Sequence, residues 1–294
     1  MMWLLLAFLS ATLLGFYDVC KKKALRSNPV LPVLFLNTLF CSLIFLPVAL
    51  RPDVPFGGWE VQRYIVLKSL IVLASWLCGY YGMKYLPLTV VGPINATRPV
   101  MVLLGALLLF GERLNLYQWV GVLLAILSFY MLSRSGKKEG IDFRHNRWIL
   151  LTVLASVFGA LSGLYDKYLM ASVDDGGVGL NRMTVQSYYN FYQCLLMGFI
   201  LWKMHAKDRP ILQKEGFGWI ILVSVFLSAA DFAYFYSLSL PGAMISVVSM
   251  VRRGSVLVSF SVGALVFHEK NLRSKAVDLA LVLLGMIFLY LGTN

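Results

Sequence analysis

Charge is scarce in this sequence. Asp, Glu, Lys and Arg make up 14% of its 294 residues, whereas a soluble domain carries about a quarter. The four cysteines show no metal-ligand or redox spacing, and the three histidines lie far apart. The sequence also has no glycine-rich nucleotide-binding loop, no Ser-His-Asp arrangement and no paired carboxylates at a catalytic spacing. We therefore expect no enzyme activity, no catalytic residue, no metal site and no cofactor.

Hydrophobic residues are abundant instead, at 59% of the chain. Several apolar runs reach the roughly 17 to 25 residues that a helix needs to cross about 30 Å of hydrocarbon, and none alternates as a membrane β-strand would. The apolar N-terminal run has no basic segment before it and many similar runs after it, so we interpret it as a span and not as a signal peptide. The sequence predicts an all-α integral membrane protein with ten transmembrane helices. The predicted spans are 2–19, 31–50, 64–82, 89–110, 117–132, 148–170, 183–202, 219–238, 243–267 and 276–292.

The second half of the chain repeats features of the first half in the same order. Gly-Phe-Tyr-Asp at 15–18 recurs as Gly-Leu-Tyr-Asp at 163–166, Leu86-Pro87 with Arg98 eleven positions after the proline recurs as Leu240-Pro241 with Arg252, and Phe110-Gly111-Glu112 recurs as Phe267-His268-Glu269. We expect a five-helix repeat over 1–136, a polar linker over 137–147 and a second five-helix repeat over 148–294. Because each repeat has an odd number of spans, the two repeats would be inverted, as in many transporters.

The basic residues favour one orientation in the membrane. The net charge is +12, and most Lys and Arg lie in the connections between spans, where phospholipid headgroups and not nucleic acid are the expected partner. The connections at one end of the bundle carry 17 Lys and Arg, against 4 in the connections at the end where both termini lie. By the positive-inside rule, both termini would lie outside the cytoplasm.

Arginines inside the spans indicate the binding site, because an Arg exposed to lipid near a helix centre costs at least about 2.5 to 3.5 kcal/mol. Arg98 and Arg252 each lie about ten residues into their spans, so in an inverted pair of helices they approach the midplane from opposite sides. Together with Arg253 they would form one basic centre. Guanidinium groups bind phosphate or carboxylate through paired hydrogen bonds. The alternative is that these arginines pair permanently with intramembrane aspartates and tie helices together.

The intramembrane carboxylates are candidates for gating or coupling. Tyr17-Asp18 and Tyr165-Asp166 occupy equivalent positions in the two halves, which indicates a shared role. They would act either as gate partners of the arginines or as carboxylates that bind protons. Asp231, in the eighth span, is a candidate of the same kind.

The pattern resembles the drug/metabolite transporter superfamily, in its ten-helix branch built from two EamA-type domains. The resemblance covers the whole chain and is carried by ATRPVMVLLGALLLFGERLNLYQWVGVLL at 96–124 and VRRGSVLVSFSVGALVFHEKNLRSKAVDLALVLLG at 251–285. It implies that the third and eighth helices line the substrate cavity, so that Trp76, Tyr80 and Tyr234 face the substrate. It also implies cytoplasmic termini, the opposite of what the charge distribution predicts.

A second resemblance, within the same superfamily, concerns the triose-phosphate translocators. They carry an adjacent Lys-Arg pair in the ninth helix that binds the substrate phosphate, and Arg252-Arg253 is similar in position and chemistry. They also place a lysine in the fourth helix where this sequence has Asn95, and Arg98 lies three residues later. The resemblance implies that both Asn95 and Arg98 lie at the substrate site.

These observations predict a secondary active transporter for a small anionic or zwitterionic metabolite, phosphorylated or carboxylated, that works by alternating access. Two alternatives stay open. One is an exporter of amino acids or amphipathic drugs in which the arginines are structural. The other is a membrane enzyme or a protein that handles lipids or lipid-linked substrates. The expected partners are a small-molecule substrate and membrane lipids. We expect a monomer or homodimer in the bacterial inner membrane.

Overall fold

The computed structural model describes residues 2–101, 104, 115–137, 145–170, 173, 176–204, 216–239, 251–266 and 272–292. In these residues the regular structure is helical, with no strand. The motifs Phe110-Gly111-Glu112, Leu240-Pro241 and Phe267-His268-Glu269 lie outside the described residues. The helices are α1 (Met2–Ser27), α2 (Val30–Ala49), α3 (Gly58–Tyr85), α4 (Leu88–Ala96), α6 (Leu116–Lys137), α7 (Arg147–Met170), α8 (Arg182–Lys203), α9 (Phe217–Ser239), α11 (Ser255–Val266) and α12 (Leu272–Leu291).

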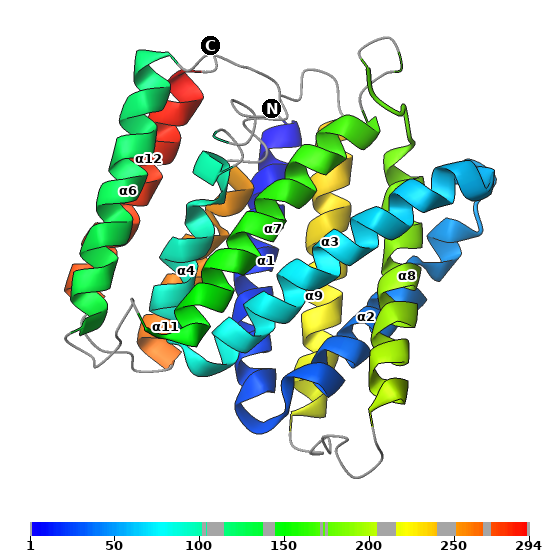
Figure 1. Cartoon of the computed structure of the whole chain (residues 1–294), viewed down its shortest axis with the longest axis horizontal. Helices are drawn as coiled ribbons and strands as arrows, with labels where there is room; N and C mark the ends of the chain where they lie inside the picture. Colours follow the sequence, from blue (N-terminus) through cyan, green and yellow to red (C-terminus); the bar gives the residue numbers. More distant parts are fainter. Residues whose placement is uncertain are drawn as a thin grey trace.

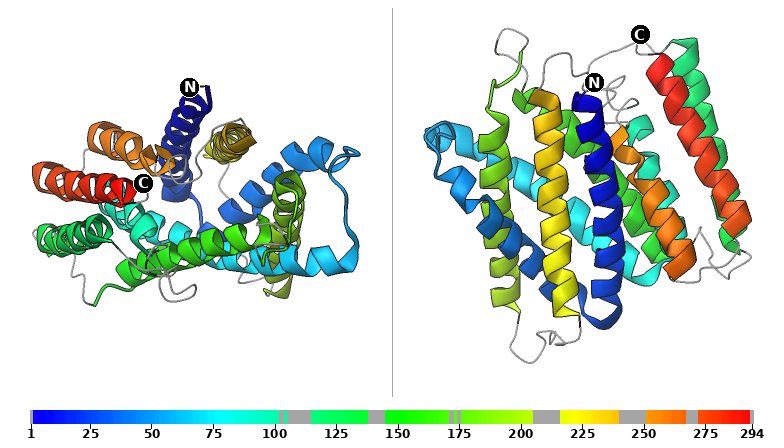
Figure 2. Two further views of the ribbon diagram at one scale, coloured as in Figure 1. Left: turned by 90° about the horizontal axis from the view of Figure 1, so that it is seen from above. Right: turned by 180° about the vertical axis from the view of Figure 1, so that it is seen from behind.

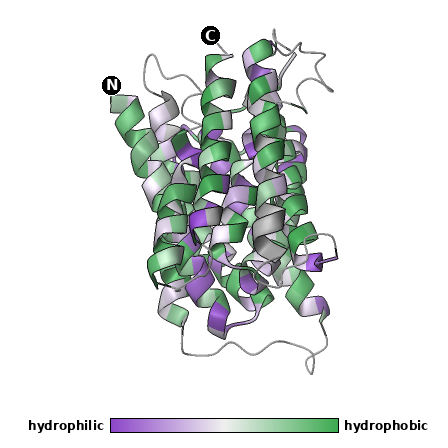
Figure 3. Cartoon of the chain, turned by 90° about the vertical axis from the view of Figure 1, so that its left-hand side faces the viewer, coloured by the Kyte–Doolittle hydropathy of each residue, from purple (hydrophilic) through white to green (hydrophobic). Residues whose placement is uncertain are grey.

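Length and composition allow five of these helices to cross a membrane unaided: α1, α2, α3, and the stretches Arg147–Asp166 of α7 and Phe217–Tyr234 of α9. The other helices lie alongside them in one bundle (Figure 1). Large apolar side chains such as Leu5 and Leu195 are exposed, and hydrophobic residues recur along the helices coloured by hydropathy in Figure 3. Apolar outer faces are typical of helices surrounded by lipid. The fold class predicted from the sequence, an all-α integral membrane protein, is confirmed.

The helices form two layers. α1, α9 and α11 lie in one layer, and α3, α7 and α4 lie in the other (Figure 1, Figure 2). α1 packs along α9, while its repeat equivalent α7 packs along α3. α2 packs against α8, and α6 against α12. If each of the first five helices is replaced by its equivalent among the last five, and the reverse, the same pairs of packed helices result. The packing therefore follows the two-fold relation expected of inverted repeats. The boundaries of the two repeats stay a prediction.

Several helices extend beyond the predicted spans. α1 continues to Ser27 although its apolar run ends at residue 19, and α3 covers Gly58–Tyr85 where 64–82 is predicted. Lysine and arginine are good helix formers, and positive charge near a helix C-terminus is favourable. The apolar run therefore marks the part of the helix within the hydrocarbon, and the helix itself is longer.

The fourth and ninth predicted spans are interrupted near their middles. α4 ends at Ala96, and the chain turns at Thr97 before it becomes helical again. Pro99 has no N–H to continue the ladder, which explains the break. α11 begins at Ser255, directly after a turn at Gly254, and glycine is a weak helix former. Interrupted helices in equivalent positions of two repeats are typical of transporter binding sites.

Candidate functional site

Three arginines lie at the two helix breaks. Arg98 follows the break beside α4, and Arg252 and Arg253 precede the break before α11. α4 and α11 pack against each other, and Arg253 interacts electrostatically with both Arg98 and Arg252. All three side chains are partly buried. The fold thus brings together three positive charges that lie up to 155 positions apart in the sequence.

Arg252 is neutralised by its surroundings. Its Nη2 forms an ion pair with Asp231 Oδ1 of α9, and its guanidinium lies over the ring of Tyr234, 4.2 Å from the ring centroid. Gln186 of α8 donates to the other Asp231 oxygen at 3.3 Å. Arg252 is therefore held by a carboxylate and an aromatic face, and it links α9 to the segment that precedes α11.

Arg98 has no carboxylate partner among the described residues. Its Nη2 donates to Asn95 Oδ1 at 3.3 Å, and the same oxygen accepts a hydrogen bond from Ser156 Oγ at 3.2 Å. Its Nε is buried without an acceptor. The guanidinium lies against α7 at Gly159, where a Cβ atom would come within 2.9 Å of Arg98 Cζ. Helix α7 thus makes room for the guanidinium without neutralising it.

Arg253 forms no ion pair with any described residue. Its nearest charges include Arg98 and Arg252, which repel it, and Asp18, which attracts it. Of the three arginines at the helix breaks, Arg98 and Arg253 are therefore the ones whose charge no described carboxylate offsets through an ion pair. A bound anion would offset both, and it would also relieve their mutual repulsion.

Asp18 and Tyr17 lie next to the arginines and meet Tyr80 of α3. Asp18 acts electrostatically on both Arg98 and Arg253, but its ion pair is with Lys21 Nζ at 2.8 Å. The Lys21 ammonium lies 4.2 Å from the Tyr17 ring centroid and 5.2 Å from that of Tyr80. The Tyr17 hydroxyl donates to the Tyr80 hydroxyl at 3.5 Å.

Asp166, the repeat equivalent of Asp18, also pairs with a lysine. Lys68 Nζ lies 2.6 Å from Asp166 Oδ2 and 2.6 Å from Ser162 Oγ, which ties the first half of α3 to the second half of α7. Tyr165 donates to the backbone oxygen of Tyr64 at 3.3 Å. Seven residues of α7 separate Asp166 from Gly159, which is about 10 Å along a helix axis. Asp18 and Asp166 thus each pair with a lysine, and of the two only Asp18 acts electrostatically on Arg98 and Arg253.

The predicted aromatic residues have different surroundings. Tyr234 contacts Arg252 and Tyr80 contacts Lys21, as described above. Trp76 is partly buried and packs against an apolar cluster that contains Val72 of its own helix and Tyr189 of α8. No described contact joins Trp76 to the arginines.

Sequence reasoning missed the residues that position the arginines. Gly159, Ser156 and Lys21 have no signal as single residues, because glycine, serine and lysine are common in helices and at helix ends. Gln186 did carry a signal: with Asn190 and Gln193 it places an amide on one face of α8 at each turn. These three side chains are buried, and amides buried in a membrane protein indicate an interior polar surface.

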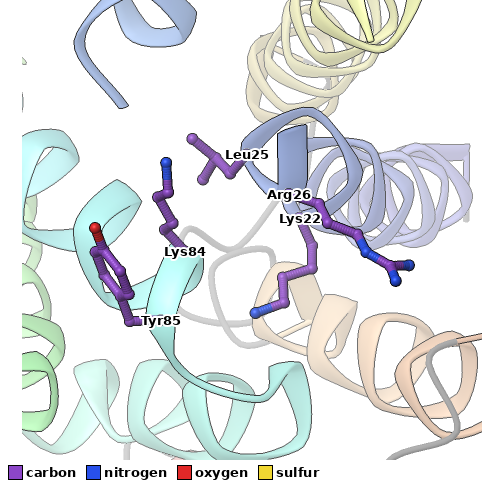
Figure 4. A pocket seen from close by; sticks show the side chains of 5 residues that line it. All are labelled: Lys22, Leu25, Arg26, Lys84 and Tyr85. Carbon is purple, nitrogen blue, oxygen red and sulfur yellow. The ribbon is translucent and has the colours of Figure 1, made fainter. Parts of the chain in front are cut away.

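A pocket of about 300 Å³ lies between the ends of α1 and α3. Figure 4 shows its lining side chains, with Lys22, Leu25 and Arg26 from α1 and Lys84 and Tyr85 from α3. Lys22 Nζ donates to the backbone oxygens of Met83 and Leu86, and Lys84 Nζ donates to that of Asn28. The pocket is basic, and it lies at the end of the bundle opposite the termini.

Comparison with known proteins agrees with this architecture. An uncharacterized transporter from Archaeoglobus fulgidus is 28% identical over 141 residues, which are 47% of this chain and 50% of that protein. The chain thus spans about half the length of that curated relative. Protein RarD from Streptomyces exfoliatus is 27% identical over 242 residues, or 82% of this chain and 66% of that protein. A crystal structure of another protein superposes with a TM-score of 0.64 over 97% of this chain and 98% of its own, at 13% identity, which shows similarity of fold alone.

Two further matches bear on the family. A probable 4-amino-4-deoxy-L-arabinose-phosphoundecaprenol flippase subunit, ArnE from Pectobacterium atrosepticum, is 32% identical over 87 residues, which are 30% of this chain and 72% of that protein. The EamA-like transporter family matches residues 1–134, the part that holds α1 to α6 and Arg98. Together with the helical membrane fold, these matches show that the chain belongs to the EamA-like transporter family, within the drug/metabolite transporter superfamily.

Proposed function

We propose that this transporter carries a small anionic or zwitterionic metabolite, with a phosphate or carboxylate bound between Arg98 and Arg253. One observation carries the proposal: these two arginines lie at breaks in packed, repeat-equivalent helices and have no carboxylate partner among the described residues. An unpaired Arg costs at least about 2.5 to 3.5 kcal/mol in the membrane interior. An anion held by both guanidinium groups offsets part of that cost.

The helix break before α11 adds to the positive potential. α11 begins at Ser255, two residues after Arg253, and the N-terminus of a helix carries a partial positive charge from its unpaired N–H groups. Arg253 and this helix terminus together favour a negatively charged group. Arg252 has a different role in the proposal, because its pairing with Asp231 supports the shape of the site and leaves the anion to the other two arginines.

The energy source in this proposal is a solute gradient or exchange, and the mechanism is alternating access between the two repeats. The ArnE relative is named as a flippase subunit for a lipid-linked sugar whose name contains both an amino group and a phosphate. That cargo is consistent with a site that binds an anionic group next to a carboxylate such as Asp18. We propose no catalytic step and no cofactor.

Counterflow in proteoliposomes tests the proposal. Proteoliposomes that contain the purified chain are loaded with unlabelled organophosphates, amino acids or nucleotide-linked sugars. Uptake of the labelled solute into these proteoliposomes is then measured. Arg98→Gln and Arg253→Gln are each expected to weaken the apparent affinity for an anionic substrate at least tenfold, which corresponds to about 1.4 kcal/mol. Arg63→Gln is the matched control, because Arg63 is exposed at the start of α3. Uptake undiminished in the double variant of Arg98 and Arg253 would sink the proposal.

The second candidate function is an exporter of amino acids or amphipathic drugs in which the arginines are structural. The pairing of Arg252 with Asp231 and Tyr234 favours it, since that arginine does tie two helices together. The counterflow experiment separates the two candidates. The exporter predicts uptake that survives the loss of Arg98 and Arg253 and is insensitive to inorganic phosphate.

We further propose a location in the bacterial inner membrane, as a monomer or homodimer, with the basic end of the bundle in the cytoplasm. Lys84 and Lys203 end α3 and α8 at that end, and Lys21, Lys22 and Lys23 lie near the same end of α1. Positive charge accumulates on the cytoplasmic side of membrane proteins. A C-terminal reporter active only outside the cytoplasm is expected to be active, and a signal from a reporter active only in the cytoplasm would reverse the orientation.

A further inference from the structure

The Lys21 ammonium lies in an enclosed site whose chemistry suits a primary amine. Its contacts are the Asp18 carboxylate at 2.8 Å and the rings of Tyr17 and Tyr80 at 4.2 and 5.2 Å from their centroids. Aromatic faces and a carboxylate are the groups that recognise alkylammonium ligands. Lys21 is only 7% exposed. We call the site formed by Asp18, Tyr17 and Tyr80 the ammonium box.

The ammonium box lies within electrostatic range of Arg98 and Arg253. Asp18 acts on Arg98 and Arg253, and Arg98 in turn acts on the Lys21 ammonium. A site with one carboxylate beside two guanidinium groups matches a molecule that carries an ammonium group and an anionic group a few bonds apart. In the structure, Lys21 supplies the ammonium part of that pattern from within the chain.

The basic pocket lies one helical turn beyond the ammonium box on both helices. Leu25 follows Lys21 by four residues on α1, and Lys84 follows Tyr80 by four residues on α3, so each pair shares a helix face. Leu25 and Lys84 line the pocket (Figure 4). The pocket therefore lies between the box and the basic end of the bundle, and its cations attract the anionic part of an approaching solute.

We propose that the ammonium box is the subsite for a primary ammonium group of the substrate, and that Lys21 occupies it until the substrate displaces it. The inference rests on the proposed function, because Arg98 and Arg253 would hold the anionic group of the same molecule. Lysine suits the exchange: its long flexible stem lets the ammonium move toward the polar helix end, where Lys22 and Arg26 already line an open pocket.

Two pairs of small probes, each differing by one amine, test this inference. O-phosphoethanolamine is compared with ethyl phosphate, and β-alanine with propionate, by measuring binding to the full chain in lipid nanodiscs. The readout is the ratio of the two dissociation constants in each pair. If Lys21 occupies the ammonium box about nine-tenths of the time, the apparent affinity of the box for the amine of a probe is about tenfold weaker than without Lys21. Lys21→Met is therefore expected to raise the preference for the aminated probe about tenfold.

Two further variants test whether Tyr80 and Asp18 recognise the amine. Tyr80→Leu is expected to lower the preference for the amine, because it removes one aromatic face. The double variant Lys21→Met with Asp18→Asn removes both charges of that ion pair, and it is expected to lose the preference while it still binds ethyl phosphate or propionate.

The outcomes separate this inference from the proposed function. If the anionic probes bind in an arginine-dependent way but Lys21→Met leaves the ratio unchanged, the ammonium subsite is wrong and the anion site stands. If no probe of either pair binds the wild-type chain or the Lys21→Met variant, both are overturned. A higher ratio in Lys21→Met that the added Asp18→Asn change abolishes supports the subsite.

Discussion

Replacing Gly159 with alanine is expected to weaken substrate binding without unfolding the protein. A Cβ atom at this position of α7 would lie 2.9 Å from Arg98 Cζ and Nη1 and 3.0 Å from Nε, whereas nonbonded heavy atoms pack best about 3.5 to 4.0 Å apart. The crowded atoms are the end of a flexible side chain, so the guanidinium moves and the helices keep their places. Relief of the contact requires a shift of about 0.5 to 1 Å.

A shift of that size is large for a binding group. The hydrogen bond from Arg98 Nη2 to Asn95 is already 3.3 Å long, and a further displacement takes it beyond the useful range, which ends near about 3.5 Å. Misplacing a positioned group by about 1 Å can cost about 100-fold in activity. We expect binding of the anionic substrate to weaken about 10- to 100-fold, or by about 1.4 to 2.7 kcal/mol. Alanine is more favourable than glycine in a helix by about 1 kcal/mol. The free energy of unfolding should therefore change by less than about 1 kcal/mol.

The assay is substrate binding and counterflow, together with thermal unfolding of the purified protein. Gly79→Ala is the matched control, since a Cβ atom at Gly79 of α3 would meet Ala155 of α7 at 3.5 Å, an ordinary contact. It should bind as the wild type does. A Gly159→Ala protein with wild-type affinity would refute the idea that the place of the Arg98 guanidinium determines binding.

Three further substitutions are expected to change stability, measured as the free energy of unfolding. Asp231→Asn leaves Arg252 without its carboxylate and should cost about 3 to 5 kcal/mol, and adding Arg252→Leu should recover part of that loss; an equal loss in both proteins would argue against the ion pair. Gly82→Ala puts a Cβ onto Thr152 Oγ1 of the facing helix and should cost about 1 to 3 kcal/mol, while Thr152→Ala in the same protein should relieve it if this contact is the cause. Gln193→Leu removes an amide whose nitrogen and oxygen are both buried without a hydrogen-bond partner among the described residues. It should stabilise the protein by about 1 to 3 kcal/mol, and a loss of stability would show that water or substrate hydrogen-bonds to the amide.

The predicted spans agree with the observed helices where the length and hydropathy of an apolar run determine the ends of the helix. The apolar runs at 183–202 and 219–238 correspond to α8 and α9 within two residues at each end, because a helix in hydrocarbon must satisfy its own backbone. The repeated Leu-Pro to Arg spacing placed Arg98 and Arg252 in equivalent helices. The breaks at Thr97 and Gly254 were not predicted, because a proline or glycine inside an apolar run is compatible with either a continuous or an interrupted helix.

The sequence by itself determined the membrane fold, the apolar core of each span and the presence of charged residues that need partners. It could not determine the partners. Asp231 and Arg252 lie 21 positions apart, and Lys68 and Asp166 lie 98 apart. Such pairs meet only after separate helices have packed, and pairing energy depends on distance and burial, which the order of residues does not contain. Tertiary structure alone therefore decided that Arg252 is neutralised, while Arg98 and Arg253 have no carboxylate partner in the part of the chain that the structure describes.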